Sequence, residues 1–170
     1  MSTNRLPVGL FALSTLALIV AGTAQAQTVR IQLSSVATVQ VTHDIAPKNT
    51  LNKGDWVFFK DLLLNRVAQF GKAKSRPVAY DVGTVTYLDG VRRTMKCTVT
   101  FPGIGTVTYG GLIVDRKDGT TVFPITGGTG GFTGAKGTMT FGRSAKTPAN
   151  ILEVTVPGHK IDVNAAGGVA

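Results

Sequence analysis

The sequence places two adjacent residues that exchange protons, His43 and Asp44, at the end of an alternating segment. Histidine titrates near neutral pH, and a carboxylate in an apolar cavity can be tuned to do the same. Both are therefore candidate catalytic residues. Because Val39, Val41 and His43 share one face of a strand, Asp44 lies on the other face unless a bulge resets the alternation. The alternative role for either residue is to cap a turn.

The three tyrosines are candidate ligand-binding residues. Tyr87 and Tyr109 alternate with valines, so each falls in an apolar row, and Tyr80 opens the same segment as Tyr87. A phenolic hydroxyl that faces a cavity can hydrogen-bond a ligand. The alternative is a packed ring whose hydroxyl reaches the rim of the fold.

Several classes of reactive site lack their sequence patterns. Neither the His-Glu-x-x-His nor the Cys-x-x-Cys spacing of metal sites occurs, and no Gly-x-Ser-x-Gly element is present. We therefore expect no metal site. Cys97 is the single cysteine, so an intrachain disulfide is impossible, and its alternating context predicts a small buried side chain.

The glycine-rich segment 127–137 resembles a phosphate-binding loop only superficially. It ends in Ala135-Lys136-Gly137 where the loop needs Gly-Lys-Ser or Gly-Lys-Thr, and a strand-like pattern follows where the loop needs a helix. The segment instead predicts a hairpin whose glycines adopt positive φ and allow close strand approach.

Alternation with a period of two residues dominates the chain after residue 26, and Gly, Pro and Asp interrupt it at intervals. This pattern is typical of short strands joined by hairpins, as in a sandwich or a barrel. We predict an all-β fold, an eight-stranded antiparallel up-and-down β-barrel of the calycin-like type. The strands are expected near 29–43, 55–64, 77–88, 91–101, 105–115, 120–126, 132–142 and 150–157, with 61–70 left open and a break near Ser34-Ser35.

The first 26 of the 170 residues read as a cleaved signal peptide. Arg5 precedes an apolar run, and Ala24-Gln25-Ala26 supplies the small residues of a cleavage site. We expect a single barrel domain over 27–163, a flexible tail over 164–170, and a periplasmic or extracellular location. The apolar run is short for a membrane span and no basic cluster follows it, so stable membrane insertion is not predicted. The net charge of +9 comes from scattered basic residues, so no nucleic-acid groove is predicted either.

Three segments resemble two related plant families. The run from Ile125 to Gly137 is similar to the glycine-rich hallmark of allene oxide cyclases and dirigent proteins. Gly54-Asp55-Trp56-Val57-Phe58-Phe59 resembles a Gly-Asp stretch of both, and Thr42-His43-Asp44-Ile45 resembles the dirigent His-Asp motif. The likeness spans about 40 to 157 and points to a secreted, bacterial-type dirigent-like member of this barrel superfamily.

The resemblance implies an antiparallel barrel with an apolar cavity, no cofactor and a homotrimer. It implies that Asp44 takes the place of the acid that polarises the substrate. It also implies that Lys136 takes the place of a dirigent Arg and keeps its charge. Ala46 stands where the cyclases have Asn.

Two functions follow from these observations. The first is a cofactor-free cyclase or isomerase that folds a small apolar or phenolic molecule in the cavity and orients it for reaction. The alternative is a secreted barrel without catalysis, which binds a ligand or acts as a structural protein. The Ala46 and Lys136 departures favour the alternative slightly.

Overall fold

The computed structural model describes residues 26–45, 47–48, 50, 52–114, 119–144, 147–157 and 161–163. Residues 1–25 of the predicted signal peptide, Ala46 and the predicted tail lie outside them. No helix among the described residues is long and apolar enough to cross a membrane.

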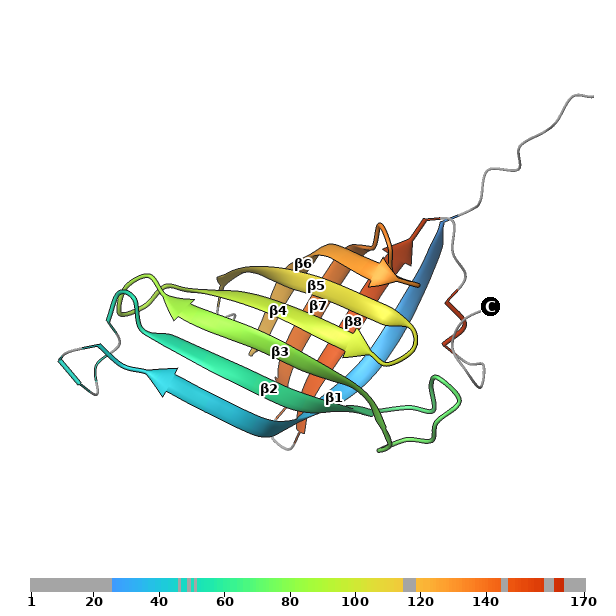
Figure 1. Cartoon of the computed structure of the whole chain (residues 1–170), viewed down its shortest axis with the longest axis horizontal. Helices are drawn as coiled ribbons and strands as arrows, with labels where there is room; N and C mark the ends of the chain where they lie inside the picture. The colour runs from blue at the N-terminus through green and yellow to red at the C-terminus, as the bar shows by residue number, and fades with distance from the viewer. Residues whose placement is uncertain are drawn as a thin grey trace, which may run out of the picture.

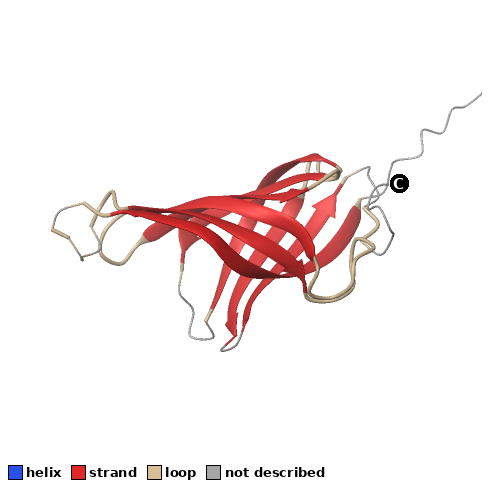
Figure 2. Cartoon of the chain, turned by 60° about the horizontal axis from the view of Figure 1, so that its bottom comes forward, coloured by secondary structure: helices blue, strands red, loops and turns tan. Residues whose placement is uncertain are grey.

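Eight antiparallel strands close into a barrel, in which each strand pairs with the next and β8 pairs with β1 (Figures 1 and 2). The predicted fold class is therefore confirmed. Strand β2 also takes in the first half of the stretch 61–70 that the sequence left open. The strands are β1 (Gln27–His43), β2 (Trp56–Asn65), β3 (Pro77–Tyr87), β4 (Arg93–Phe101), β5 (Gly105–Ile113), β6 (Thr120–Gly130), β7 (Lys136–Ser144) and β8 (Thr147–Val156).

Strand β1 does not break near Ser34 but contains a bulge between Ala37 and Val39. Before the bulge, Ala37 pairs with Asp61 on the inner face of the barrel; after it, Val39 pairs with Lys60 on the outer face. The extra residue, Thr38, therefore reverses the alternation. As a result, the apolar row that ends at His43 faces outward, while Gln40 and Thr42 face inward.

The core fills the barrel with the inward residues of all eight strands. Valine, leucine and isoleucine dominate β1 and β8, whereas β4, β5 and β6 contribute larger rings. The largest fully buried side chains include Tyr109, Phe101, Phe123, Phe132, Ile31, Leu33, Leu63, Met139 and Leu152. Burial of this apolar area supplies the main driving force for folding, since the described residues contain no disulfide.

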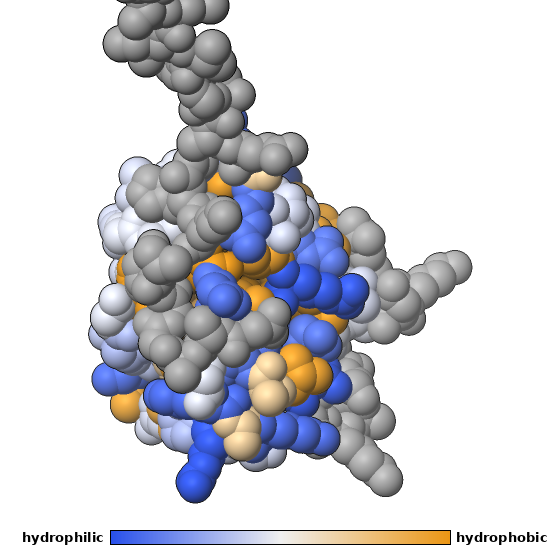
Figure 3. All heavy atoms as spheres, turned by 90° about the vertical axis from the view of Figure 1, so that its right-hand side faces the viewer, coloured by the Kyte–Doolittle hydropathy of each residue, from blue (hydrophilic) through white to orange (hydrophobic). Residues whose placement is uncertain are grey.

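One end of the barrel is plugged by an aromatic cluster. Phe101 packs against Phe70 and Phe132, with ring centroids 5.2 and 5.1 Å apart. The C-terminal segment seals the same end, because Ile161 is buried and its amide donates to the Gln27 side chain at 2.9 Å. Figure 3 views the molecule from this end, with apolar atoms visible at the centre among hydrophilic ones.

The glycine-rich segment forms the β6–β7 hairpin, as predicted. Gly130 and Gly134 have φ of +59° and +74°, which glycine adopts without strain. A Cβ on Gly130 would lie 2.4 Å from the Ile104 carbonyl oxygen of the adjacent turn. The hairpin thereby brings Phe132 into the plug, so the motif has a structural role here.

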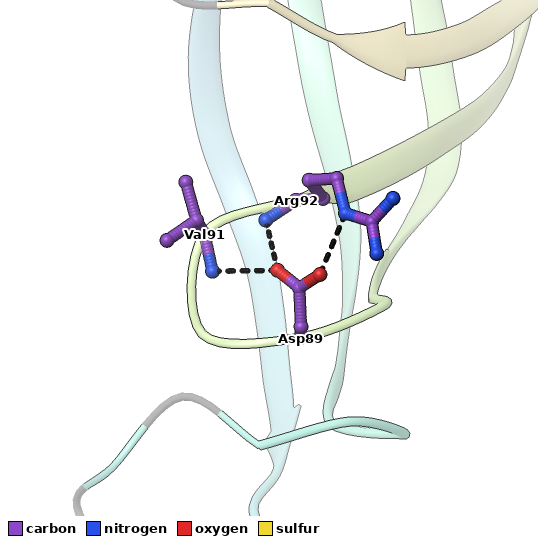
Figure 4. Close-up of polar contacts among 3 residues, drawn as sticks. All are labelled: Asp89, Val91 and Arg92. Atoms are coloured by element: carbon purple, nitrogen blue, oxygen red, sulfur yellow. Dashed lines mark hydrogen bonds and ion pairs between the residues drawn. The ribbon is translucent and has the colours of Figure 1, made fainter.

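Two carboxylates organise the connections at the opposite end. Asp55 is buried and accepts hydrogen bonds from the amides of Ile45 and Asn52, both at 2.7 Å, which lower its pKa. Asp89 accepts from the amides of Val91 and Arg92 and pairs with the Arg92 guanidinium at 2.6 Å (Figure 4). Each carboxylate therefore replaces the backbone partners that its loop lacks.

Candidate functional site

Two carboxylates face each other inside the barrel. Asp61 on β2 and Asp81 on β3 are direct cross-strand partners. They share the inner face with the buried side chains of Leu63 and Ala79, and Gly83 lies in the same row of β3. Directly opposed residues on one face of an antiparallel pair have Cβ atoms about 5 Å apart, so the two carboxyl groups interact.

Asp81 is the more deeply buried of the pair, with 1% of its surface exposed. Neither carboxylate oxygen has a hydrogen-bond partner among the described residues. Burial, followed by the charge of Asp61, raises the Asp81 pKa to about 7, and nearby backbone groups of both residues offset this only in part. The carboxyl group therefore populates both its acid and its base form near neutral pH, as a proton-transfer group must.

Asp61 is only half-buried, and desolvation raises its pKa. It lies nearer the bulge of β1, where it pairs with Ala37. Two carboxyl groups at this separation cannot both ionise freely, because their negative charges repel. Asp61 and Asp81 therefore titrate as a coupled pair.

A phenol and a thiol lie next to Asp81 on the inner face, in the row that contains its neighbour Gly83. Cys97 on β4 and Tyr109 on β5 are cross-strand partners, and both are buried. Desolvation and then the charge of Asp81 raise the Cys97 pKa, so this thiol is not an activated nucleophile. The Tyr109 pKa is raised by burial and by the charges of Cys97, Asp81 and Asp61, which places all four groups in one neighbourhood.

The Asn150 amide is a further buried polar group without hydrogen bonds to described residues, while the buried Tyr109 hydroxyl interacts with the Cys97 thiol. Asn150 on β8 is fully buried between Leu33 and Phe141, its partners on the neighbouring strands. Buried polar atoms in native proteins are nearly always paired. Groups of this kind are paired with ordered water or with a bound molecule, so they mark the polar part of the barrel interior.

Aromatic rings border this polar group. Tyr109 contacts Phe123 and Phe141, with ring centroids 6.0 and 5.8 Å apart. Phe59 lies over Gly83, because a Cβ at that position would be only 2.4 Å from the ring. The site thus combines a pair of acids with flat apolar walls.

The sequence-predicted site residues lie in different places. His43 is exposed on the outer face and stacks on Trp56, with centroids 5.3 Å apart. Asp44 follows the last residue of β1 and is half-buried, and its carbonyl accepts a hydrogen bond from Lys48. Asp44 is seven residues beyond Ala37, the partner of Asp61, which is roughly 20 Å along a strand. The structure does not bring it to the acid pair.

The predicted ligand-binding residues also separate. Tyr109 is central, but Tyr80 lies on the outer face with the Lys60 ammonium 5.3 Å from its ring centroid. Tyr87 ends β3, where its backbone bonds to Gly54 and Asp55, and Lys136 is exposed at the start of β7. These placements leave one tyrosine of the predicted set beside the acids.

The sequence reasoning missed Asp61, Asp81 and Asn150. A signal for Asp81 was present, because it occupies the same alternating row as Ala79, Gly83 and Val85. A charged residue in a row that otherwise faces the core is a candidate for function. Asn150 gave a weaker signal of the same kind, because it precedes the apolar row of Leu152, Val154 and Val156 at the predicted start of the last strand.

A separate groove of about 720 Å³ lies on the outer face of β3, β4 and β5. Its side chains are mainly threonines with Lys96 at one side, and Gly110 forms part of its floor. It contains none of the interior acids. No group of three or more potential metal ligands occurs among the described residues.

Comparison with known proteins supports the fold through structure alone. No family model matches the chain, and no curated protein matches its sequence. A solved structure of pyocyanin demethylase is 21% identical, with a TM-score of 0.61, over 74% of this chain and 99% of the other. The pterocarpan synthase dirigent protein PsPTS1 is 18% identical, with a TM-score of 0.59, over 81% and 98%. A second such dirigent protein, GePTS1, is 19% identical, with a TM-score of 0.58, over 83% and 89%. The chain therefore has the barrel fold that dirigent proteins and pyocyanin demethylase share.

Proposed function

We propose that this protein binds a small unsaturated molecule, apolar or phenolic, inside its barrel and directs a cofactor-free cyclisation or isomerisation of it. The observation that carries the proposal is the buried Asp81 carboxylate, which faces Asp61 and has no hydrogen-bond partner among the described residues. The names of the similar structures, a synthase and a demethylase, support a barrel that acts on small molecules.

In the proposed reaction, Asp81 removes a proton from one atom of the bound molecule and returns a proton to another. Such a step needs no oxidant, because the product has the same atoms and electrons as the substrate. A pKa of about 7 makes both half-steps accessible at neutral pH. The Tyr109 hydroxyl and the Asn150 amide orient the polar end of the molecule, and the aromatic walls hold its apolar part.

The proposal includes export through the predicted signal peptide and assembly as a homotrimer. An apolar outer face supports self-association: Val36, Val39 and Val41 on β1 are 47%, 43% and 49% exposed. Phe58 and Leu62 of β2 are their direct or near cross-strand neighbours. Contiguous exposed apolar surface is typical of protein interfaces.

The second candidate function is a barrel that binds its ligand without converting it. Dense packing of Tyr109, Phe123 and Phe141 favours this function, because little movement of a bound molecule is possible between such rings. Neither Asp44 nor His43 reaches the interior acids, so a catalytic role for either residue stays a prediction separate from the acid pair.

The test begins with native mass spectrometry of the purified protein, followed by extraction and identification of the bound molecule. The molecule is then incubated with the wild type, with Asp81→Asn, and with Glu153→Gln as a control. Glu153 is an exposed acid of the outer face, so the control matches the charge change. Turnover lost only in Asp81→Asn supports catalysis. A bound molecule recovered unchanged from all three proteins supports the second candidate, and a protein without any bound or bindable molecule overturns both.

A further inference from the structure

The loop that joins β2 to β3, residues 66–76, carries positive charge without any acidic side chain of its own. No acid occurs between Asp61 and Asp81, and the basic residues of this stretch are Arg66, Lys72, Lys74 and Arg76. No ion pair joins any of these four side chains to a described acidic residue. Because a cluster of one charge sign attracts ions of the opposite sign, this loop favours anions.

Buried side chains hold the β2–β3 loop in one conformation. The Asn65 amide donates to the carbonyl oxygens of Gln69 and Lys72 at 2.8 and 3.0 Å. The Gln69 side chain accepts from the Gln32 amide at 3.0 Å and donates to its carbonyl oxygen at 2.9 Å. The Phe70 ring is buried in the aromatic cluster that plugs this end of the barrel. A ligand therefore does not have to order the loop, which removes one cost of association.

The backbone of the same loop is strained at two positions. Phe70 and Ser75 have φ of +54° and +65°, and they are the non-glycine residues with positive φ in the described part of the chain. The strain at Phe70 has a packing explanation, because the turn carries its ring into the aromatic cluster. Ser75 is exposed, so its conformation serves only the course of the chain between Lys74 and Arg76. Strain without a packing explanation is typical of segments held for function.

A hollow of about 490 Å³ lies on the surface beside the loop. Lys72 and Arg76 are its charged residues, and the others are Gly71, Ala73 and Pro77. The Lys72 ammonium donates to the Pro77 carbonyl oxygen at 3.0 Å, which holds this charge at the hollow and leaves it further N–H groups to donate. The volume falls within the range of small-molecule sites, so the hollow accommodates more than a single ion.

The two charged side chains of the hollow differ in a way that suits an oxyanion. The guanidinium of Arg76 is a planar fork that can donate two parallel hydrogen bonds to a carboxylate, sulfate or phosphate group. The ammonium of Lys72 is a compact charge that can contact a third oxygen. Gly71, Ala73 and Pro77 add no side-chain donor or acceptor, so the charged pair decides what is bound.

We propose that the β2–β3 loop is a second binding site, in which Lys72 and Arg76 hold the oxyanion of an organic molecule: a carboxylate, a sulfate ester or a phosphate ester. Arg66 and Lys74, which flank these residues in the loop, attract the anion from a distance. The carrier of the oxyanion is either a small molecule or one unit of an acidic polysaccharide.

The proposed site is separate from the interior of the barrel. The loop lies at the end that the aromatic cluster plugs, at the right in Figure 1, and its hollow contains neither of the interior acids. Binding of an oxyanion here therefore does not depend on the function proposed for the interior, and each can fail without the other.

The experiment measures binding of matched charged and neutral sugars by isothermal titration calorimetry. The full protein is titrated with glucose 6-sulfate, glucose 6-phosphate and glucuronate, and with glucose as the neutral counterpart. Heparin and neutral dextran form the polymer arm. All titrations are made at about 0.15 M salt, where charges more than about 8 Å apart are largely screened, so the signal reports local contacts.

Two double variants of equal net charge separate the site from the general positive charge of the protein. Lys72→Gln with Arg76→Gln removes both cations of the hollow. Lys60→Gln with Lys96→Gln is the matched control, because both lysines are exposed on the outer faces of strands and neither belongs to the hollow. Arg76→Lys keeps the charge and removes the planar fork, and circular dichroism checks that each variant is folded.

We expect at least one of the three charged sugars to bind about tenfold tighter than glucose, which corresponds to one charge-assisted contact. The Lys72/Arg76 double variant should lose this preference, the Lys60/Lys96 control should keep it, and Arg76→Lys should fall between them. A preference shown by heparin over dextran but by none of the small sugars, and lost only in the Lys72/Arg76 variant, would assign the site to an acidic polysaccharide.

Two results would overturn the inference. If neither the charged sugars nor heparin binds the wild type more tightly than its neutral counterpart, the loop is not an oxyanion site. If both double variants lose affinity equally, the binding reports the net charge of the protein and not this hollow. The comparison of charged with neutral ligands on the wild type decides the first point without any variant.

Discussion

Asp61 and Asp81 oppose each other across β2 and β3 on the inner face of a closed barrel, and only one of them reaches solvent to any extent. Two carboxyl groups in this position destabilise the folded state whenever both are ionised. Their retention in an otherwise apolar row is therefore better explained by binding or chemistry than by stability.

The pH dependence of stability should report this burial. The folded-state pKa of Asp81 is raised from 3.8 to about 7, so the folded protein holds the proton more tightly than the unfolded chain. Its contribution is fully present below about pH 4 and is lost as pH rises through about 7, by up to about 4 kcal/mol. Urea unfolding of the wild type between these limits measures the decline, and Asp81→Asn should flatten it. An equal decline in the variant would assign the effect to other groups.

Replacement of Asn150 by leucine should stabilise the protein while weakening ligand binding. The leucine has a similar volume and no polar atoms, so it removes two unpaired groups from a fully buried position. We expect a gain of about 1–3 kcal/mol in the free energy of unfolding. Thermal unfolding without ligand measures the gain, and calorimetry with a bound ligand measures the loss. A destabilised Asn150→Leu would mean that the amide is already satisfied in the folded protein.

Gly83 should tolerate no larger residue while Phe59 is present. A Cβ there would lie 2.4 Å from the Phe59 ring and 2.9 Å from the Lys96 carbonyl oxygen. Gly83→Ala should therefore cost about 1–3 kcal/mol, as overpacking does. A double-mutant cycle with Phe59→Leu separates the two contacts. Partial rescue is expected because the backbone contact remains, and complete additivity would show that the ring does not restrict this position.

The β3–β4 turn should lose order only in strong acid. Hydrogen bonds from the Arg92 and Val91 amides, then the Arg92 guanidinium, lower the Asp89 pKa from 3.8 to about 2. A lowered pKa stabilises the turn above about pH 4, and the contribution disappears as pH falls through about 2. The protection of the Val91 and Arg92 amides against hydrogen exchange, relative to an unfolded chain at the same pH, should decrease over that range. In Asp89→Ala, these two amides should be unprotected at every pH. Protection that persists in the variant would contradict the assignment.

Alternation was enough to predict the strands of this chain but not the direction in which all of them face. Thr94 to Phe101 keeps strict alternation, and its apolar residues are buried as expected. In β1 the same rule fails beyond Ala37, because one inserted residue changes the face without changing the residue pattern. An apolar row of Val39 and Val41 resembles a core row in sequence, although both residues are exposed.

The acid pair could not be predicted from the sequence for a different reason. Asp61 and Asp81 are twenty residues apart, and only the register of β2 against β3 brings them together. Asn150 reaches the same interior from the last strand. A sequence motif records neighbours along the chain, whereas this site arises from pairing between strands, so only closure of the barrel reveals it.

The bulge in β1 also affects how this chain should be aligned with its relatives. Deletion of Thr38 would restore uninterrupted alternation and turn Val39, Val41 and His43 toward the interior. Two sequences that differ by a single gap here would then have the same strands. The residues that face outward in one of them would correspond to residues that line the interior in the other. An alignment that misplaces this gap by one residue will assign interior residues to the exterior over the rest of the strand.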